Sequence, residues 1–307
     1  MTIDEIWEGI CKNPEDDDLR LEYANRIEAA DADHAWLIRE QIRRSREAQA
    51  GRYDVPSGRE QGLCDWAPDR WASQLLKFSA THQPSDIVFW RGFPAFVHVN
   101  PETFIEYADL LFRLAPIRVV QFGLPYVESG YWLDLPKDER PPFPTAKLFT
   151  MPQLSRLDGV AFVQHRELPD DLAPGIAACP HLTRCQWIGF AGHAVVPNFI
   201  ALAQGELTRK MLCIHGSDVE YYGERRQEEL DEYDQQYTRT YFAQRGKELE
   251  QEYGYIPWLH PSHNETGWQD AVYKVEHGIL PKYKPGTPPM PEWYEFPVEY
   301  RPRRWWD

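Results

Sequence analysis

Histidine and cysteine are the residue types in this chain whose spacing comes closest to that of a reactive site. His260 and His263 are three residues apart and could supply two ligands to a metal ion. Pro261 lies between them and prevents the regular helix that would align the two rings. No cysteine or third ligand lies nearby in the sequence, so we expect neither a metal ion nor any other cofactor.

Two cysteines each precede a histidine by two residues, the combination of a thiol nucleophile and a base. These pairs are Cys179 with His181 and Cys213 with His215. A small buried cysteine more often fills space in a core, and Cys185 falls at an inward position of the pattern described next. The sequence also has no phosphate loop, Gly-x-Ser-x-Gly or Gly-x-Gly-x-x-Gly. We therefore predict no catalytic residues and a protein that is not an enzyme.

Three segments of the chain resemble one another and recur at a nearly fixed distance. They cover residues 151–157, 179–185 and 205–210, and a shorter fourth copy covers 115–122. Their leading leucines, Leu154, Leu182 and Leu207, are 28 and then 25 residues apart. Such a period is typical of a leucine-rich-repeat-like solenoid, in which each repeat adds one short strand to a parallel sheet. The alternative is an ordinary α/β layer with chance similarity.

Each repeat carries an arginine two residues after its leading leucine, which predicts a column of like charges on adjacent strands. The arginines are Arg156, Arg184 and Arg209, and strand alternation places Asp158, Gln186 and Met211 in the next outward column. Leu157 and Cys185 should point inward between them. Arginines about 5 Å apart require an anionic neighbour. It could be an acidic segment of this chain or of a partner, or the ladder could simply be solvated.

Helices are expected ahead of the repeats. Thr2 to Glu5 form a capping box, and the acidic run at 15–18 begins a second helix with Leu19, Tyr23 and Ile27 inward. This run lacks the glycine and distal glutamate of a calcium loop. A third helix covers 35–46, with Ile38 and Ile42 inward. Its outward arginines form a solvated face or, as the weaker alternative, touch nucleic acid; they are Arg39, Arg43, Arg44 and Arg46.

Alternating helix and strand patterns connect these helices to the first repeat. We expect a loop over 51–62, a short helix over 66–78, strands over 87–93 and 95–99 separated at Gly92, and a helix over 101–114.

Several blocks in this region resemble the bacterial repeat-companion domain. They are Asn13-Pro14-x-Asp16-Asp17-x-x-Arg20-Leu21-x-Tyr23-Ala24, Ala35-x-x-Ile38-Arg39-x-Gln41, Trp90-Arg91-Gly92-Phe93 and Leu114-Ala115-Pro116-Ile117-Arg118. Asn25 and Arg26 depart from the family's pattern, which has aspartate and tryptophan there. The resemblance covers about 6–122 and implies architecture without implying chemistry. It predicts that residues 1–90 form a helical cap on a solenoid spanning 91–216.

Beyond the repeats the composition changes. Residues 217–253 contain a long acidic amphipathic helix, and residues 254–307 form a tail rich in proline and aromatic side chains. We expect the tail to lie extended against a surface, either of the chain's own solenoid or of a partner. An insertion at 126–144 should form a loop on one rim of the solenoid. Aromatic side chains in these two segments are candidates for partner contacts: Trp132, Trp293, Trp305 and Trp306.

Charge and cysteine usage limit the possible functions. The formal net charge of −15 argues against nucleic-acid binding. No apolar run is long enough to span a membrane, the first residues lack the pattern of a signal peptide, and five cysteines without CxxC spacing suit the cytoplasm. We predict a scaffold that binds another protein, with no small-molecule substrate. The alternative is a regulatory or inhibitory subunit whose acidic helix and tail dock into another protein, and an enzyme of unknown type is third.

Overall fold

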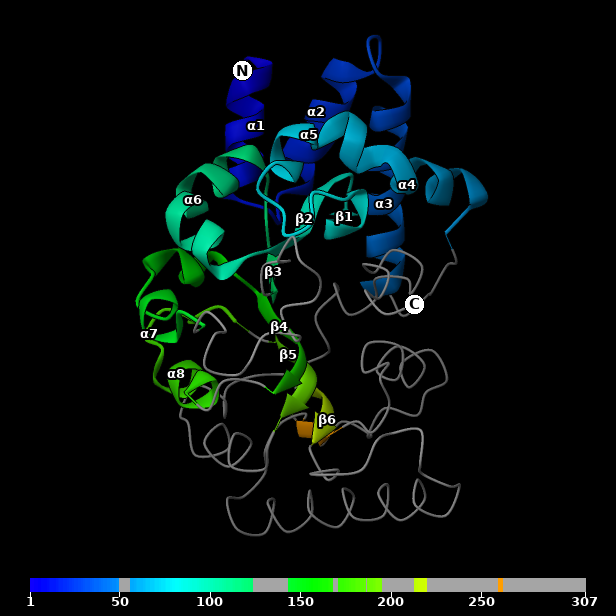
Figure 1. The fold of residues 1–307 in the computed structure, drawn as a ribbon. Helices are drawn as coiled ribbons and strands as arrows, with labels where there is room; N and C mark the ends of the chain where they lie inside the picture. The colour runs from blue at the N-terminus through cyan, green and yellow to red at the C-terminus, as the bar shows by residue number, and fades with distance from the viewer. Residues whose placement is uncertain are drawn as a thin grey trace, which may run out of the picture. The chain divides into compact units, whose positions relative to one another are not determined.

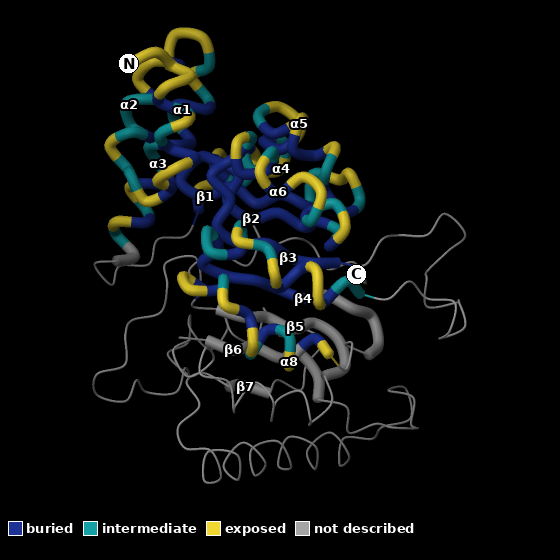
Figure 2. Tube along the Cα trace, turned by 90° about the vertical axis from the view of Figure 1, so that its left-hand side faces the viewer, coloured by how far each residue is buried: buried dark blue, intermediate teal, exposed yellow. Residues whose placement is uncertain are grey.

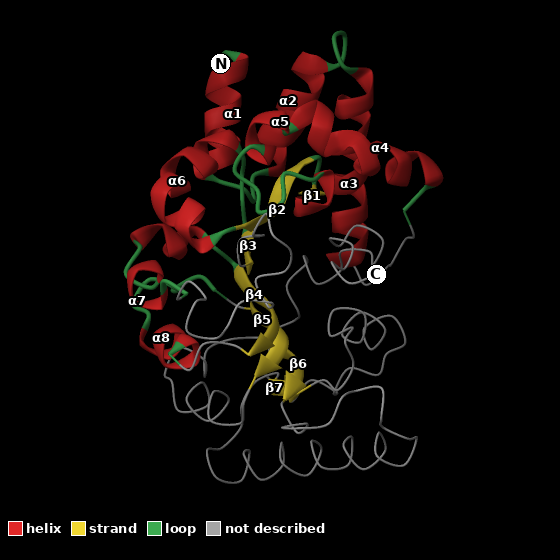
Figure 3. Ribbon diagram, viewed as in Figure 1, coloured by secondary structure: helices red, strands yellow, loops and turns green. Residues whose placement is uncertain are grey.

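The computed structural model describes residues 1–49, 56–123, 143–167, 171–185, 187–194, 213–219 and 259–261. The chain divides into two units, one with the described residues up to 123 and the other with those from 143 onward. Each unit contains helices and strands, so the fold is mixed α/β, as the sequence predicts (Figures 1 and 3). Within the described residues, no helix is both long enough and apolar enough to cross a membrane.

The first unit is mainly helical. Its helices are α1 (Ile3–Lys12), α2 (Asp17–Ile27), α3 (Ala32–Gln49), α4 (Gly58–Trp71), α5 (Ser73–Leu76), η1 (Pro84–Asp86) and α6 (Pro101–Leu114). Its strands are β1 (Ile87–Trp90), β2 (Phe93–Val99) and β3 (Val119–Gly123).

Side chains cap the first two helices as the sequence predicts. The backbone N–H of Thr2 donates to Glu5 Oε2 over 2.7 Å, and the backbone N–H of Glu5 donates to Thr2 Oγ1 over 3.2 Å. Asp16 accepts a hydrogen bond from the backbone N–H of Leu19 at the start of α2. Each bond satisfies a donor that the first helical turn leaves free.

Two helical predictions need correction. Residues 58–62, predicted as loop, belong to α4, because Ser57 Oγ accepts a hydrogen bond from the backbone N–H of Glu60 and starts the helix early. In α2 the fully buried stripe contains Arg20 and Ala24, whereas the predicted inward residues Leu19 and Tyr23 are only partly buried. The chain therefore buries a charged side chain where the apolar pattern predicts leucine.

The three strands of this unit follow from a hairpin and a crossover. β1 pairs antiparallel with β2, and Trp90 lies opposite Phe93 across a turn formed by Arg91 and Gly92. β2 then pairs in parallel with β3, and α6 connects them. The helix over 101–114 and the break at Gly92 confirm the predictions, because both depend on local signals.

The core of this unit lies between α1, α2, α3 and the hairpin. Ile6, Ile10 and Ile38 are fully buried there around Phe93, whose side chain is also fully buried. The ring of Trp7 lies 5.7 Å from that of Phe93. Figure 2 shows this distribution, with buried residues on the inner faces of the helices and along the strands.

The second unit contains a set of parallel strands. Its described helices are α7 (Thr145–Leu148), η4 (Pro152–Arg156) and α8 (Leu172–Ala178), and its strands are β4 (Gly159–Glu167), β5 (Trp187–Ala194), β6 (Cys213–Val219) and β7 (Leu259–Pro261). β4 pairs with β5, β5 with β6 and β6 with β7, all in parallel. β7 comes from the segment predicted as the tail; the rest of that segment lies outside the described residues, as does the predicted acidic helix.

Strand pairing in this unit follows the sequence period. Gly159 lies opposite Trp187, 28 residues later, and Trp187 lies opposite Cys213, 26 residues later. Leu154 and Leu182 are fully buried, and Leu157 and Cys185 are buried as predicted. The first step equals the spacing of the leading leucines, and the second is one residue longer than their 25.

Candidate functional site

A strained two-residue turn in the first unit organises a group of charged side chains. Arg91 and Gly92 have φ angles of 50° and 80°. Positive φ at both positions is the backbone of a type I′ hairpin turn, and it is uncommon for arginine. A Cβ added to Gly92 would lie 2.2 Å from Ile38 Cγ1 and 2.6 Å from Ile38 Cα, so the turn also needs glycine for its close approach to α3.

Side chains from α2 and α3 bind three polar groups of this turn. Arg20 Nη1 donates to the Arg91 carbonyl over 3.1 Å, and the Gly92 N–H donates to Gln41 Oε1 over 2.7 Å. His34 Nε2 lies 2.9 Å from the Gly92 carbonyl. These bonds fix the hairpin against the helices, because each group would otherwise be buried without a partner.

His34 binds the turn as a neutral ring. Burial lowers its pKa to about 4, which outweighs the opposing effects of the Gly92 carbonyl and Asp31. The proton of the neutral ring is then on Nε2, because this atom donates to the carbonyl oxygen. The ring stacks on Trp71 with centroids 4.2 Å apart. Trp71 Nε1 in turn donates to Asp31 Oδ2 over 2.8 Å.

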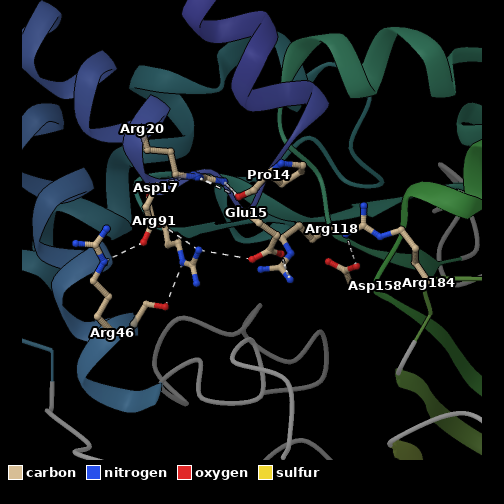
Figure 4. Close-up of polar contacts among 10 residues, drawn as sticks. Pro14, Glu15, Asp17, Arg20, Arg46, Arg91, Arg118, Asp158 and Arg184 are labelled. Carbon is tan, nitrogen blue, oxygen red and sulfur yellow. Dashed lines mark hydrogen bonds and ion pairs between the residues drawn. The ribbon is translucent and has the colours of Figure 1, made fainter. Parts of the chain in front are cut away.

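Three arginines surround the ring of Trp90 at the end of β1. The Cζ atoms of Arg91, Arg118 and Arg20 lie 4.0, 4.2 and 5.8 Å from the ring centroid. Their side chains are almost completely buried; that of Arg91 is 4% exposed and that of Arg118 is 9% exposed. We call these four residues the arginine–tryptophan cluster, and Figure 4 shows its three arginines. It joins α2, the hairpin turn and the residue before β3.

The cluster brings three buried positive charges close together, which is electrostatically unfavourable. Burial, together with the positive charges of Arg91 and Arg118, lowers the pKa of Arg20 to about 9, against the opposing effect of Asp17 and Glu15. The Arg20 guanidinium donates to the Pro14 carbonyl through Nε over 3.2 Å and Nη2 over 2.9 Å. Buried cations at this separation are stable only when anions or dipoles face them.

Two carboxylates face the cluster, that of Glu15 in the α1–α2 connection and that of Asp17 at the start of α2. Asp17, whose side chain is 17% exposed, contacts Arg91 Nη1 over 3.1 Å and Arg46 Nε over 3.1 Å. Glu15 contacts both Arg91, over 3.6 Å, and Arg118. The Glu15 side chain is 45% exposed, although both of its arginine partners are buried. The arrangement binds two carboxylates (Figure 4), and one of them, that of Glu15, borders solvent.

The predicted partner-binding residues that the structure describes are Arg156, Asp158 and Arg184, and they precede the strands of the second unit. Arg156 is the last residue of η4 and Arg184 lies in a bend three residues before β5, so the prediction that both lie on strands is wrong. The physical reason is the 3-10 turn over Pro152–Arg156, which delays the strand to Gly159. Asp158 was predicted to point outward, but it is buried. It accepts a hydrogen bond from Arg184 Nη2 over 2.9 Å.

The hydrogen bond between Arg184 and Asp158 identifies an anionic neighbour for one of the predicted arginines. Asp158 precedes β4 and Arg184 precedes β5, so the pair joins the segments that lead into two neighbouring strands. The acid that neutralises Arg184 thus comes from the segment that leads into the neighbouring strand. The Arg184 side chain remains 46% exposed and can also contact another molecule. The other predicted contact residues lie outside the described residues: Arg209, Gln186, Met211, Trp132, Trp293, Trp305 and Trp306.

The cysteine and histidine candidates give no assembled reactive site among the described side chains. Cys179 is buried, its thiol donates to the Phe149 carbonyl over 3.3 Å, and burial raises its pKa, which opposes thiolate formation. Cys213, His215 and His260 lie on β6 and β7, where no side chain is described, and His263 is outside the described residues. Within the described residues, no group of three or more His, Cys, Asp or Glu side chains could hold a metal ion.

One histidine–carboxylate pair was not predicted. His98 Nδ1 lies 3.0 Å from Asp86 Oδ1, and both side chains are buried. Burial opposes ionisation of Asp86, but the hydrogen bond and charge of His98 keep its pKa below the usual value. A Cβ added to Gly123 would lie 2.0 Å from His98 Nε2, so the backbone of β3 closes against the ring. The pair therefore holds η1, which ends at Asp86, to β2, and the contact with β3 leaves no room for a substrate at Nε2.

The arginines of α3 form ion pairs within the chain. Arg39 contacts Glu28, Arg43 contacts Glu40, Arg44 contacts Glu60 and Arg46 contacts Asp17. Each therefore has a carboxylate partner, which weakens the nucleic-acid alternative for this face.

The arginine–tryptophan cluster was not predicted from the sequence. Arg20, Trp90, Arg91 and Arg118 all fall within the blocks that resemble the repeat-companion domain. A further signal was the register of α2, because Arg20 is four and seven residues before the buried Ala24 and Ile27. Comparisons of the chain with models of protein families, with curated proteins and with solved structures found no match.

Proposed function

We propose that the protein is a non-enzymatic scaffold that binds another protein through its repeat region. In this proposal the first unit is a cap of the repeat-companion type, and the second is a short leucine-rich-repeat-like solenoid followed by an acidic helix and an aromatic tail. The supporting observation is the pairing of β4, β5 and β6 in parallel at steps of 28 and 26 residues, with Leu154 and Leu182 buried at equivalent places. Stacked repeats of this kind present an extended surface suited to protein ligands.

The chemistry of the described side chains favours binding over catalysis. Three groups that could react are engaged in structural contacts: Cys179 with a backbone carbonyl, His34 with the hairpin turn and His98 with Asp86. A catalytic group needs access to its substrate, and these three are buried.

Arg184 is the described residue best placed to contribute to the interface. Its guanidinium is held by Asp158 and is still 46% exposed, so its orientation is set before a partner arrives. Arginine is enriched at the centres of protein interfaces because its planar group can donate several hydrogen bonds at once. Arg156, at the equivalent position one repeat earlier and partly exposed, is the second candidate.

Charge reversal at these two arginines tests the proposal. The full-length chain is immobilised in three forms, namely wild type, Arg156→Glu with Arg184→Glu, and a control with Lys77→Glu and Lys147→Glu. The two control lysines are exposed, and the change in net charge is the same. Proteins captured from the native cytoplasm are quantified by mass spectrometry, and circular dichroism checks that each variant is folded.

We expect proteins that the wild type and the lysine control capture and that the arginine variant loses. An identical set of captured proteins for all three forms would show that Arg156 and Arg184 do not contribute to the interface. A substrate converted by the wild-type chain and not by the arginine variant would overturn the assignment as a non-enzymatic scaffold.

A further inference from the structure

We infer that the arginine–tryptophan cluster is a binding site for the carboxylate of a partner's acidic segment, and that Glu15 occupies this site when the partner is absent. This site lies in the first unit, apart from the residues proposed above for the repeat face. It rests on the proposed function only in that the ligand is a protein.

The first observation is the contrast between the two carboxylates that face the cluster. Asp17 begins α2, is largely buried and contacts two arginines, Arg91 and Arg46. Glu15 lies in the turn between α1 and α2, and nearly half of its side chain is exposed. Capping of α2 is performed by Asp16 and not by Glu15. The Glu15 side chain can therefore leave without uncapping the helix.

The second observation is that Arg91 and Arg118, the two arginines that contact Glu15, are held in fixed positions. Arg91 is held by Ser45 Oγ over 3.1 Å, by Asp17 and by the face of Trp90. Arg118 lies over the same ring, 4.2 Å from its centroid. Guanidiniums that are fixed in advance lose little freedom when an anion binds, and their low exposure strengthens the attraction. A second carboxylate from outside would meet a preformed site.

The third observation is the electrostatic cost of removing the anion without replacing it. Arg20 already has a lowered pKa because of burial and because Arg91 and Arg118 are close. Movement of Glu15 into solvent would leave Arg91 and Arg118 less neutralised, so departure should be coupled to the arrival of another anion. The observed occupant is a carboxylate, which favours an aspartate- or glutamate-rich segment as its replacement.

Binding of a fluorescent hexaglutamate peptide to the full-length chain tests this inference. Glu15→Gln keeps the shape of the side chain and removes the competing charge. Glu8→Gln is the matched control, because Glu8 is 69% exposed, contacts Lys12 on α1 and changes the net charge equally. Fluorescence anisotropy at low salt gives the dissociation constants.

We expect Glu15→Gln to bind the peptide about tenfold more tightly than wild type, because an internal competitor reduces the apparent affinity by the fraction of molecules whose site is free. Glu8→Gln should leave the affinity close to that of wild type, and adding Arg118→Gln to Glu15→Gln should abolish the gain. Equal gains for Glu15→Gln and Glu8→Gln would show a general charge effect and overturn the inference. So would a loss of thermal stability in Glu15→Gln with no gain in affinity.

A phosphoserine peptide of the same length provides the last comparison. Tighter binding of this peptide, with the same dependence on Glu15 and Arg118, would assign the site to phosphorylated partners and overturn the carboxylate assignment. The variants used here lie in the first unit, so either proposal can fail while the other stands.

Discussion

Acid should destabilise the first unit through His34, and the size of the effect follows from its burial. The pKa of His34 is about 4 in the folded chain, compared with 6.5 for an unperturbed histidine. The unfolded chain therefore takes up the proton at a higher pH than the folded chain. Stability contributed by the neutral ring is complete above pH 6.5 and is lost as the pH falls toward 4.

The magnitude can be worked out from the two pKa values. Their difference of about 2.5 corresponds to ~3.4 kcal/mol between the limits, at 1.36 kcal/mol for each unit. Between pH 7 and pH 5 the loss is about 2 kcal/mol. Other groups titrate in this range as well, so the quantity to measure is the difference between wild type and a variant that lacks the histidine.

His34→Gln is the informative variant, because a glutamine amide can donate to the Gly92 carbonyl without titrating. Urea denaturation followed by tryptophan fluorescence at pH 7, 6 and 5 gives the free energy of unfolding of both proteins. The wild type should lose about 2 kcal/mol relative to His34→Gln over this interval. Parallel pH profiles would refute the interpretation that His34 is held neutral by burial.

Three further substitutions test the packing around the same elements. Gly92→Ala should lower the free energy of unfolding by about 3 kcal/mol or more, because the added Cβ would clash with the Ile38 backbone and the residue has a positive φ. Gly62→Ala in α4 is the control, because no atom lies within 4 Å of the added Cβ. It should raise the free energy of unfolding by about 0.5 kcal/mol. Thr2→Ala removes half of the capping box and should cost about 1 kcal/mol in thermal unfolding. Arg44→Met leaves Glu60 buried without its ion partner and should cost about 3 kcal/mol at pH 7. That cost should shrink at pH 5, because burial raises the pKa of Glu60 and its protonation removes the buried charge; a cost independent of pH would contradict this reasoning.

Local signals in the sequence were sufficient for several elements. The capping box at Thr2, the helix start at the acidic run 15–18 and the helix over 101–114 depend on residues within one or two turns of each other. The hairpin break at Gly92 follows from glycine between two apolar runs. Such features are readable because their physical cause lies within the segment itself.

Features that depend on distant partners were not readable. Arg20 occupies a buried position of α2 because the Pro14 and Arg91 carbonyls accept its hydrogen bonds, and Arg91 is 71 residues away. The spacing of apolar residues in α2 does not reveal a hydrogen-bond acceptor so far away in the sequence. The strand positions predicted for Arg156 and Arg184 were wrong for a related reason. The 3-10 turn over Pro152–Arg156 moves the strand start to Gly159, and Asp158 accepts a hydrogen bond from Arg184.

Arg91 shows how the turn and the cluster depend on each other. A left-handed backbone favours glycine, asparagine or aspartate, and another residue there costs about 1 kcal/mol or more. Arginine nevertheless stands at φ 50°, with its guanidinium over Trp90 and against Asp17 and Glu15. The same turn places its carbonyl where Arg20 can bind it. The strained conformation thus brings a buried cation to the α1–α2 connection, and the half-exposed Glu15 that faces it is the point where another carboxylate can enter.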